Sequence, residues 1–427
     1  MEDNVSYLRR GALSLGAVML GGYAADYAFN LGLTRFLTPH GYGDFKVAYA
    51  FAYFTGMAVL LGGDRAAPRV LAPCLDQGEG KRVWEYLRFY LGVALGLGLA
   101  LATVTWTLSY LHVGSTDPQH HHPLAWVVVA VPLNAAAAMI SRTLQSARRP
   151  AEAAIPWRIG LPVLQLALFG LVVAVQGSLG VVEAVVIGIV ASASITMGQW
   201  LRVRRLGLVQ VEREPAFREA RQWLGASLPM MGSFLVALAL NQSDLYFMEI
   251  LGDEAEVGHY AAAATTAHLL VLVQTTIVGL VAPLAGPAVE GGKEASRSAF
   301  RQALRLMASL LFPVAGILWL AAGPILGVYG EAYRGATRVL ELLVLGTLAW
   351  ALAALSSLWL QYQGRGSVVL TISLASLIVD SGLNLLLIPR YGMAGAAAGT
   401  AATMTAAAVA IVLAHRFGPS RADSSSV

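Results

Sequence analysis

The stretch LIVDSGLNLLLIP, residues 377–389, places one carboxylate, Asp380, inside a run of apolar residues. With its flanks, the run reaches the length of about 20 residues that an apolar helix needs to cross a bilayer. A charged side chain at the centre of such a helix costs about 3 kcal/mol, so an acid there marks an ion or substrate pathway by default. The stretch therefore predicts a transmembrane helix that carries a functional polar face.

The composition of the whole chain is that of an integral membrane protein. Of its 427 residues, 57% are hydrophobic and 13% are charged, whereas soluble domains contain about 25% charged residues. The single cysteine, Cys74, excludes an internal disulfide and every cysteine-based metal cage. Basic residues lie between the apolar runs instead of forming one block, which favours a role in membrane topology and argues against nucleic-acid binding.

Apolar runs of spanning length recur along the chain and predict an all-α protein with about twelve transmembrane helices. The predicted spans are residues 11–33, 43–62, 87–111, 123–141, 155–176, 179–200, 225–250, 257–281, 302–322, 337–360, 367–388 and 394–414. Cytoplasmic loops carry an excess of Lys and Arg, so the basic residues indicate the orientation. With the N-terminus inside, only five of the 29 basic residues lie outside, namely Arg35, Lys46, Arg334, Arg338 and Arg390. Both termini are therefore predicted to be cytoplasmic.

Two pairs of motifs, six spans apart, predict an internal duplication. FLTPHGYGDF (36–45) corresponds to ILGDEAEVGHY (250–260), and VQGSLGVVEAVVIG (175–188) corresponds to LIPRYGMAGAAAGT (387–400), with Gly180 and Gly392 in matching places. Because six is even, both halves insert in the same sense, and a pseudo-twofold axis should run along the membrane normal. We thus expect two six-helix lobes with a cavity between them.

The predicted organisation has four parts. The first lobe occupies residues 1–205 and the second lobe residues 225–415. A cytoplasmic linker at 206–224 leads into an amphipathic segment in which Trp223 is expected to anchor the chain on the anionic inner leaflet. The polar tail, residues 416–427, is expected to be a disordered cytoplasmic segment.

Four further stretches carry a family resemblance. TRFLTPHGYGDFKVAYAF (34–51), LGGDRAAPRVLAP (61–73), VYGEAYRGATRVLELLVLG (328–346) and NLLLIPRYGMAGAAAGT (384–400) resemble, in matching order, the polysaccharide-exporter branch of the multidrug/oligosaccharidyl-lipid/polysaccharide (MOP) superfamily. Members of this branch include O-antigen and exopolysaccharide flippases. One departure is that the first span has no arginine between Arg10 and Arg35, whereas the lipid II flippase branch places several arginines in its first helices.

The resemblance implies a function and a set of partners. Such proteins flip polyprenyl-diphosphate-linked oligosaccharides from the cytoplasmic to the outer leaflet of the inner membrane, for surface polysaccharide biosynthesis, by alternating access. Some exploit an ion gradient, and polysaccharide polymerases and assembly proteins are the expected protein partners. The alternative within the superfamily is a cation-coupled multidrug exporter. No enzyme signature, such as a P-loop, GxSxG or HExxH, occurs in the chain, so we expect a transporter and not an enzyme.

Acidic and amide side chains within the spans predict an ion-coupling site. Asp380 and Asn384 are four residues apart and share one helix face. A hard cation such as Na⁺ prefers carboxylate, amide and hydroxyl oxygens, and further candidates for these are Asp244, Asn241, Thr400 and Thr403. Some members of the superfamily resemble this pattern, with a cation held between the corresponding helices seven, eleven and twelve. Asp380 could instead carry a proton, or the polar groups could only join helices by hydrogen bonds.

A second set of residues is a candidate for contact with the cargo. In the first span, Tyr23, Asp26, Tyr27 and Asn30 recur at helical spacing, where aromatic rings could stack on sugars and polar groups could bind hydroxyls. A diphosphate requires an arginine, whose planar fork pairs with phosphate oxygens. The candidates are Arg65, Arg69 and Arg142, of which Arg65 in GGDR is preferred. The alternatives are interfacial tyrosines and arginines that only set the topology.

Overall fold

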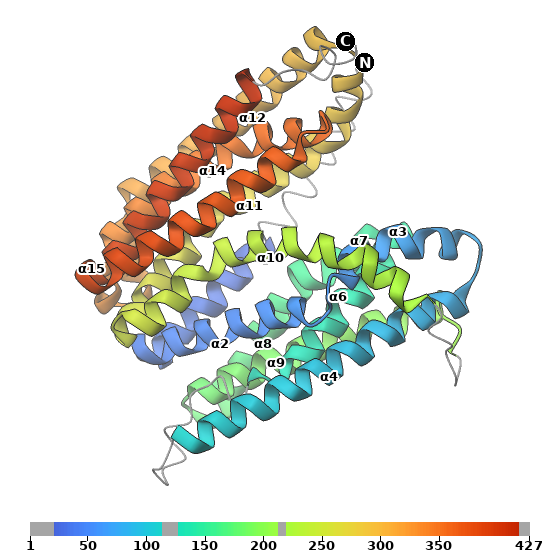
Figure 1. The fold of residues 1–427 in the computed structure, drawn as a ribbon. Coiled ribbons are helices and arrows are strands. Elements are labelled where there is room, and N and C mark those ends of the chain that lie inside the picture. Colours follow the sequence, from blue (N-terminus) through green and yellow to red (C-terminus); the bar gives the residue numbers. More distant parts are fainter. Residues whose placement is uncertain (1–20, 113–126, 212–218, 418–427) are drawn as a thin grey trace. The chain divides into compact units, whose positions relative to one another are not determined.

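The computed structural model describes residues 21–112, 127–211 and 219–417, and within these ranges the regular structure is entirely helical (Figure 1). A helix covers residues 21–36. The later helices are α2 (Pro39–Ala58), α3 (Gly63–Asp76), α4 (Gly80–His112), α6 (Ala130–Ser146), α7 (Pro150–Ile155), α8 (Leu161–Gln176), α9 (Val181–Arg205), α10 (Ala220–Leu251), α11 (Glu254–Glu290), α12 (Lys293–Leu320), α13 (Ala322–Tyr329), α14 (Thr337–Tyr362) and α15 (Gly366–Phe417). A π-helical turn, Pro156–Gly160, joins α7 to α8, and a 3-10 helix, Glu331–Ala336, precedes α14.

The helices make the chain a multi-pass membrane protein. Within the described ranges, seven are long and apolar enough to cross a membrane, or eight if the bent pair of α2 and α3 forms one span. Each predicted span coincides with helix where it is described, and the last two are joined in α15 across a break at Gly392. The count of twelve and the cytoplasmic position of the termini stay predictions.

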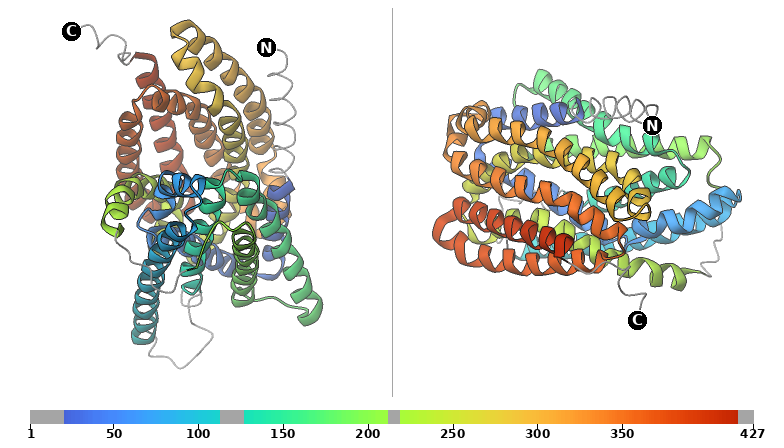
Figure 2. Two further views of the ribbon diagram at one scale, coloured as in Figure 1. Left: turned by 90° about the vertical axis from the view of Figure 1, so that its right-hand side faces the viewer. Right: turned by 90° about the horizontal axis from the view of Figure 1, so that it is seen from above.

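Among the described residues the chain divides into two compact units, one of residues 22–239 and one of residues 240–417 together with Gly21. In the first unit, α6 packs against α2, α3, α4 and α9. In the second, α14 packs against α11, α12 and α15, and these helices run alongside one another in the views of Figures 1 and 2. The division falls inside α10, whereas the sequence predicted a linker that ends at residue 224.

The predicted linker ends inside a helix. Residues 220–224 form the first turns of α10, while residues 212–218 lie outside the described residues. Trp223 does not have the surface position expected of a membrane anchor, because it is buried against Tyr86 and Phe89, with ring centroids 5.1 and 5.8 Å away. An aromatic residue on an amphipathic face can pack on protein as well as on lipid, and here the protein core is the closer apolar partner.

A break between α2 and α3 bends this helix pair by 46°. Gly62 has a φ of 77°, and a Cβ at this position would collide with the carbonyl group of Ser227, so only glycine fits. The backbone groups freed by the break are bound by side chains. The Ser227 hydroxyl donates to the carbonyl oxygen of Leu61 (2.8 Å), and the Tyr86 hydroxyl donates to that of Gly63 (2.7 Å). Asp64 and Arg65 follow directly after this break.

A second break divides α15. Gly392 has a φ of 55° and a ψ of −137°, which L side chains rarely adopt. The Met393 amide, which begins the second half of α15, donates to Glu256 Oε2 of α11 (2.8 Å). In the other unit the Gly180 amide donates to Glu183 Oε2 at the start of α9 (3.0 Å). A carboxylate at a helix N-terminus is favourable, so matching glycines of the two halves are each followed by a capped helix.

We predict that Gly392→Ala destabilises the protein. The positive φ costs an L residue about 1–3 kcal/mol, and the new methyl group would meet the Glu256 carboxylate. The melting temperature in detergent should fall. Gly382→Ala in the same helix is the control, because a Cβ there meets no atom within 4 Å. Equal melting temperatures for the two variants would contradict the role assigned to this break.

Candidate functional site

Two buried carboxylates form the centre of a polar cluster in the second unit. Asp244 lies on α10 and Asp380 on the first half of α15, with 9% and 3% of their surfaces exposed. The Asn384 amide bridges them, since Nδ2 donates to Asp244 Oδ1 (2.9 Å) and to Asp380 Oδ2 (3.2 Å). The hydroxyl of Tyr260 on α11 donates to Asp244 Oδ2 (2.6 Å), and that of Ser243 to Asp380 Oδ2 (3.0 Å). Three side chains thus donate four hydrogen bonds to the two acids in the interior.

The second half of α15 brings two threonines back to this cluster. Thr400 lies next to Asp244 and Tyr260, and Thr403 lies beside Asp380. Both threonines are buried. The two halves of α15 approach closely because glycine faces the first half, where a Cβ on Gly399 would lie 3.3 Å from Leu383 Cβ and 3.5 Å from Asn384 Oδ1. The break at Gly392 therefore assembles the site from one continuous stretch of chain.

The charges of the cluster are not balanced by basic side chains. Among the described residues, neither Asp244 nor Asp380 forms an ion pair, and the partners of both are neutral hydroxyl and amide groups. Asn384 Oδ1 is also buried and accepts no hydrogen bond from the part of the chain that the structure describes. Burying two negative charges without a counter-charge is costly. A proton or a cation would relieve this cost, and an orphaned amide oxygen beside two carboxylates is the donor set that suits a hard cation.

Most of the predicted ion-site residues come together here. The structure places Asp380, Asn384, Asp244, Thr400 and Thr403 in one cluster. The side chain of Asn241 lies outside the described residues. Sequence reasoning missed Ser243 and Tyr260. The signal for Ser243 was its position beside Asp244, and Tyr260 ends the motif ILGDEAEVGHY, which was used only as a sign of duplication.

The first unit holds its own polar group around Asp26. Asn30 Nδ2 donates to Asp26 Oδ2 (3.2 Å) and to its backbone oxygen (2.8 Å), while the Tyr42 hydroxyl donates to Asn30 Oδ1 (3.1 Å). Lys46 of α2 lies close enough to Asp26 to act on it electrostatically and sits over the Tyr42 ring. Tyr23 and Tyr27 stack with centroids 6.0 Å apart. Lys46, which the sequence placed outside as a topology residue, is the basic partner that was missed.

Of the three candidate arginines, the structure places two close together and leaves the third apart. Arg65 Nε pairs with Asp64 Oδ2 at 3.0 Å, with Asp64 buried and Arg65 about a quarter exposed. Arg142 on α6 lies close enough to both to act on them electrostatically, and it also donates to Gln145 Oε1 (2.6 Å). Arg69, one turn along α3, is exposed and takes no part in this group. Two guanidinium groups beside one buried acid leave a net positive charge that can receive an anion.

Comparisons with known proteins place the fold. A model of the family described as "Polysaccharide biosynthesis protein" matches residues 8–284, and a model of the MatE family matches residues 229–386. No curated protein sequence matches the chain closely enough to count as a relative.

Solved structures similar to the chain are transporters. One is a multidrug resistance MATE family transporter of the MOP superfamily in an inward-facing conformation (TM-score 0.73, 16% identity, 94% of this chain and 96% of that one). Another is the lipid II flippase MurJ in an inward closed conformation (TM-score 0.77, 11% identity, 95% and 88%). A third is the MATE transporter VcmN of Vibrio cholerae (TM-score 0.62, 17% identity, 97% of each chain). At these identities the likeness establishes the fold.

We predict that Tyr260→Phe destabilises the second unit. The change leaves a buried oxygen of Asp244 without its donor, which costs about 1–3 kcal/mol, so the melting temperature in detergent should fall. Tyr246→Phe is the matched control, because the buried Tyr246 hydroxyl has no hydrogen-bond partner among the described residues and its loss should be close to neutral. A fall of the same size in both variants would show that the Asp244 contact contributes nothing specific.

Proposed function

The chain belongs to the polysaccharide biosynthesis protein family, and on that premise we propose that it is a flippase for polyprenyl-diphosphate-linked oligosaccharides in the inner membrane. The family match carries the proposal, and the fold shared with MATE and MurJ transporters supports it. The cargo would cross by alternating access between two six-helix lobes, for the synthesis of surface polysaccharide. Polysaccharide polymerase and assembly proteins are the partners that such a reaction requires.

The group of Arg65, Asp64 and Arg142 is proposed to receive the diphosphate. The Arg65 side chain is oriented by the buried Asp64 carboxylate and remains partly exposed, so it can approach an anion without first being desolvated in full. A guanidinium donates two parallel hydrogen bonds to phosphate oxygens. The polar group around Asp26, with its stacked tyrosines, offers hydroxyl-binding and aromatic surfaces that suit the sugar.

The cluster around Asp244 and Asp380 is proposed to couple transport to an ion. The residues that would hold Na⁺ are Asp244, Asp380, Asn384 and the two threonines, whose oxygens match the preference of a hard cation. The ion would supply the positive charge that the described side chains around the two acids lack. A proton on one carboxylate is the alternative, and it would neutralise the same charge without using the Asn384 oxygen.

A cation-coupled multidrug exporter is the second candidate function. The observation that favours it is the match of the MatE family over residues 229–386, which includes Asp244, Asp380 and Asn384. The ion site would serve either function, because its residues lie in the second unit and the residues proposed to contact the cargo lie in the first. The two functions differ in the cargo, and the arginines of the first unit are the residues proposed to bind it.

We predict that Na⁺ stabilises the purified protein through this cluster. A ligand at one hundred times its Kd stabilises the folded state by about 2.7 kcal/mol, so the melting temperature should rise when Na⁺ replaces choline. Asp380→Asn and Asn384→Leu should abolish the rise. Asp76→Asn, in an exposed ion pair with Arg148, should retain it. If the wild-type protein melts identically in Na⁺ and choline at every pH, the Na⁺ site is disproved, which leaves a proton carrier or a cluster that only joins helices by hydrogen bonds.

We predict that Arg65→Gln and Arg142→Gln slow the flipping of a fluorescent lipid-linked oligosaccharide in reconstituted vesicles. Loss of a hydrogen bond to a charged group costs about 1.5–3 kcal/mol, so each rate should fall by about tenfold or more. Arg69→Gln, one turn away on the same helix, is the control and should flip at the wild-type rate.

A vesicle assay and a cell assay together separate the two candidate functions. Vesicles in which the wild-type protein moves no lipid-linked sugar would refute the flippase. Protection of a drug-sensitive host by the same protein would then assign it to multidrug export.

A further inference from the structure

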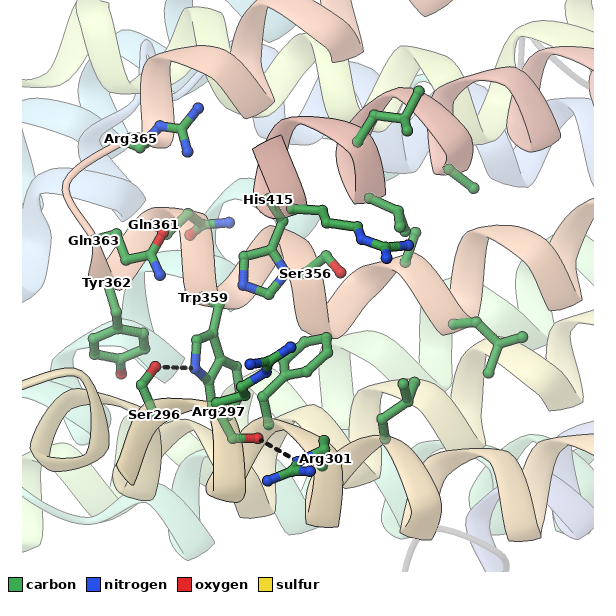
Figure 3. A pocket seen from close by; sticks show the side chains of 18 of the residues that line it. Ser296, Arg297, Arg301, Ser356, Trp359, Gln361, Tyr362, Gln363, Arg365 and His415 are labelled. Atoms are coloured by element: carbon green, nitrogen blue, oxygen red, sulfur yellow. Dashed lines mark hydrogen bonds between the residues drawn. The ribbon is translucent and has the colours of Figure 1, made fainter. Parts of the chain in front are cut away.

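A large cavity lies in the second unit, between α12, α14 and the second half of α15 (Figure 3). Its volume is about 1470 Å³, which exceeds the range of roughly 300–1,000 Å³ that is usual for sites of drug-sized ligands. The cavity is separate from the Asp244–Asp380 cluster, whose residues do not line it. Its two ends differ in chemistry.

One end of the cavity is basic. Arg297 and Arg301 are one turn apart on α12, Arg365 precedes α15, and His415 and Arg416 lie in the last turn of α15. Figure 3 shows Arg297 and Arg301 on one side, with Trp359 and His415 on the other. In the described part of the chain, none of these arginines pairs with a carboxylate. Their positive charge is therefore available to an anion.

The other end is apolar and open along its side. Leu304, Ala308 and Phe312 line it from α12, and Val409 and Leu413 line it from α15. Phe312 and Leu413 are 55% and 48% exposed. A site with this polarity matches an amphiphile that carries an anionic head group and hydrocarbon chains.

In the first unit, two tryptophan side chains occupy the positions that correspond to this cavity. Gly80 and Gly292, which precede the matching residues Lys81 and Lys293, are 212 positions apart, as are Gly180 and Gly392. This offset pairs Trp84 with Ser296 and Trp200 with Val412. In the first unit the two tryptophan rings meet, with centroids 5.9 Å apart.

In the second unit, Ser296 and Val412 both line the cavity. The basic residues near the tryptophan pair are also compensated, because Arg82 pairs with Glu79 and Glu219, and Arg202 pairs with Glu152. At these two positions the second unit has small or aliphatic side chains where the first unit has tryptophans, and its cavity keeps an aromatic wall of Phe300, Trp359 and His415.

We propose that this cavity binds an anionic phospholipid of the surrounding membrane. Basic pockets between transmembrane helices recognise anionic lipid head groups, and here the arginines lie at helix ends, where head groups are found. The apolar walls would receive the acyl chains. The inference does not depend on the identity of the cargo, because the site lies within one unit and uses none of the residues assigned to transport.

Native mass spectrometry of the detergent-purified full chain tests the proposal, with phosphatidylglycerol and phosphatidylcholine as competing probes. Wild-type protein should retain phosphatidylglycerol preferentially. Each basic residue near a head group contributes about 1 kcal/mol, so Arg297→Gln with Arg301→Gln should weaken binding by about 25-fold. Arg305→Gln, on the next turn of α12 and outside the cavity lining, should bind as wild type.

A steric variant provides a second test. Ser296→Trp with Val412→Trp copies the filling of the first unit and should exclude the lipid without a change of charge. If this variant does not fold, the arginine pair decides the matter alone. Equal retention of the two lipids by wild type, or undiminished binding by the arginine variant, would overturn the proposal. So would exclusive binding of a polyprenyl diphosphate at this place, which would make the cavity part of the cargo path.

Discussion

Two carboxylates buried in an apolar helical unit set the main constraint on this structure. Water cannot solvate Asp244 and Asp380 there, so each oxygen needs a donor from the protein. Tyr260, Ser243 and the bridging amide of Asn384 supply donors to both oxygens of Asp244 and to Oδ2 of Asp380. These contacts tie α10 and α11 to α15 at one point, and a shift of any of the three helices would leave an acid unsatisfied.

Broken helices make this arrangement possible. At Gly62 and at Gly392 the chain leaves helical geometry, and side chains from other helices bind the freed backbone groups. Backbone groups that leave helical hydrogen bonding in an apolar interior need such partners, because an unpaired buried polar group is costly. Each break precedes functional candidates, with Asp64 and Arg65 after the first and Thr400 and Thr403 after the second.

The features of this protein that depend on local sequence could be predicted from the sequence. Apolar runs gave the helices, and the spacing of Asp380 and Asn384 gave their common face, because both follow from local geometry. Ser243 and Tyr260 escaped prediction because a hydroxyl that serves a distant carboxylate carries no periodic signal of its own. Trp223 was misplaced because an amphipathic face looks the same whether lipid or protein covers it. The proximity of Lys46 to Asp26 likewise depends on tertiary packing, which the sequence pattern does not reveal.

The two halves differ in how their buried acids are neutralised. In the first unit Asp64 has Arg65, with Arg142 nearby, and Asp26 has Lys46 in its vicinity. The basic groups beside these acids are thus side chains of the chain itself. In the second unit Asp244 and Asp380 have only neutral donors among the described residues. A proton or a cation from solution, as proposed above, would supply the counter-charge that these neutral donors lack. The two halves of the fold thus differ in whether the buried acids have basic side chains beside them, and a cation bound in the second unit, as proposed above, would add its binding free energy to that half alone.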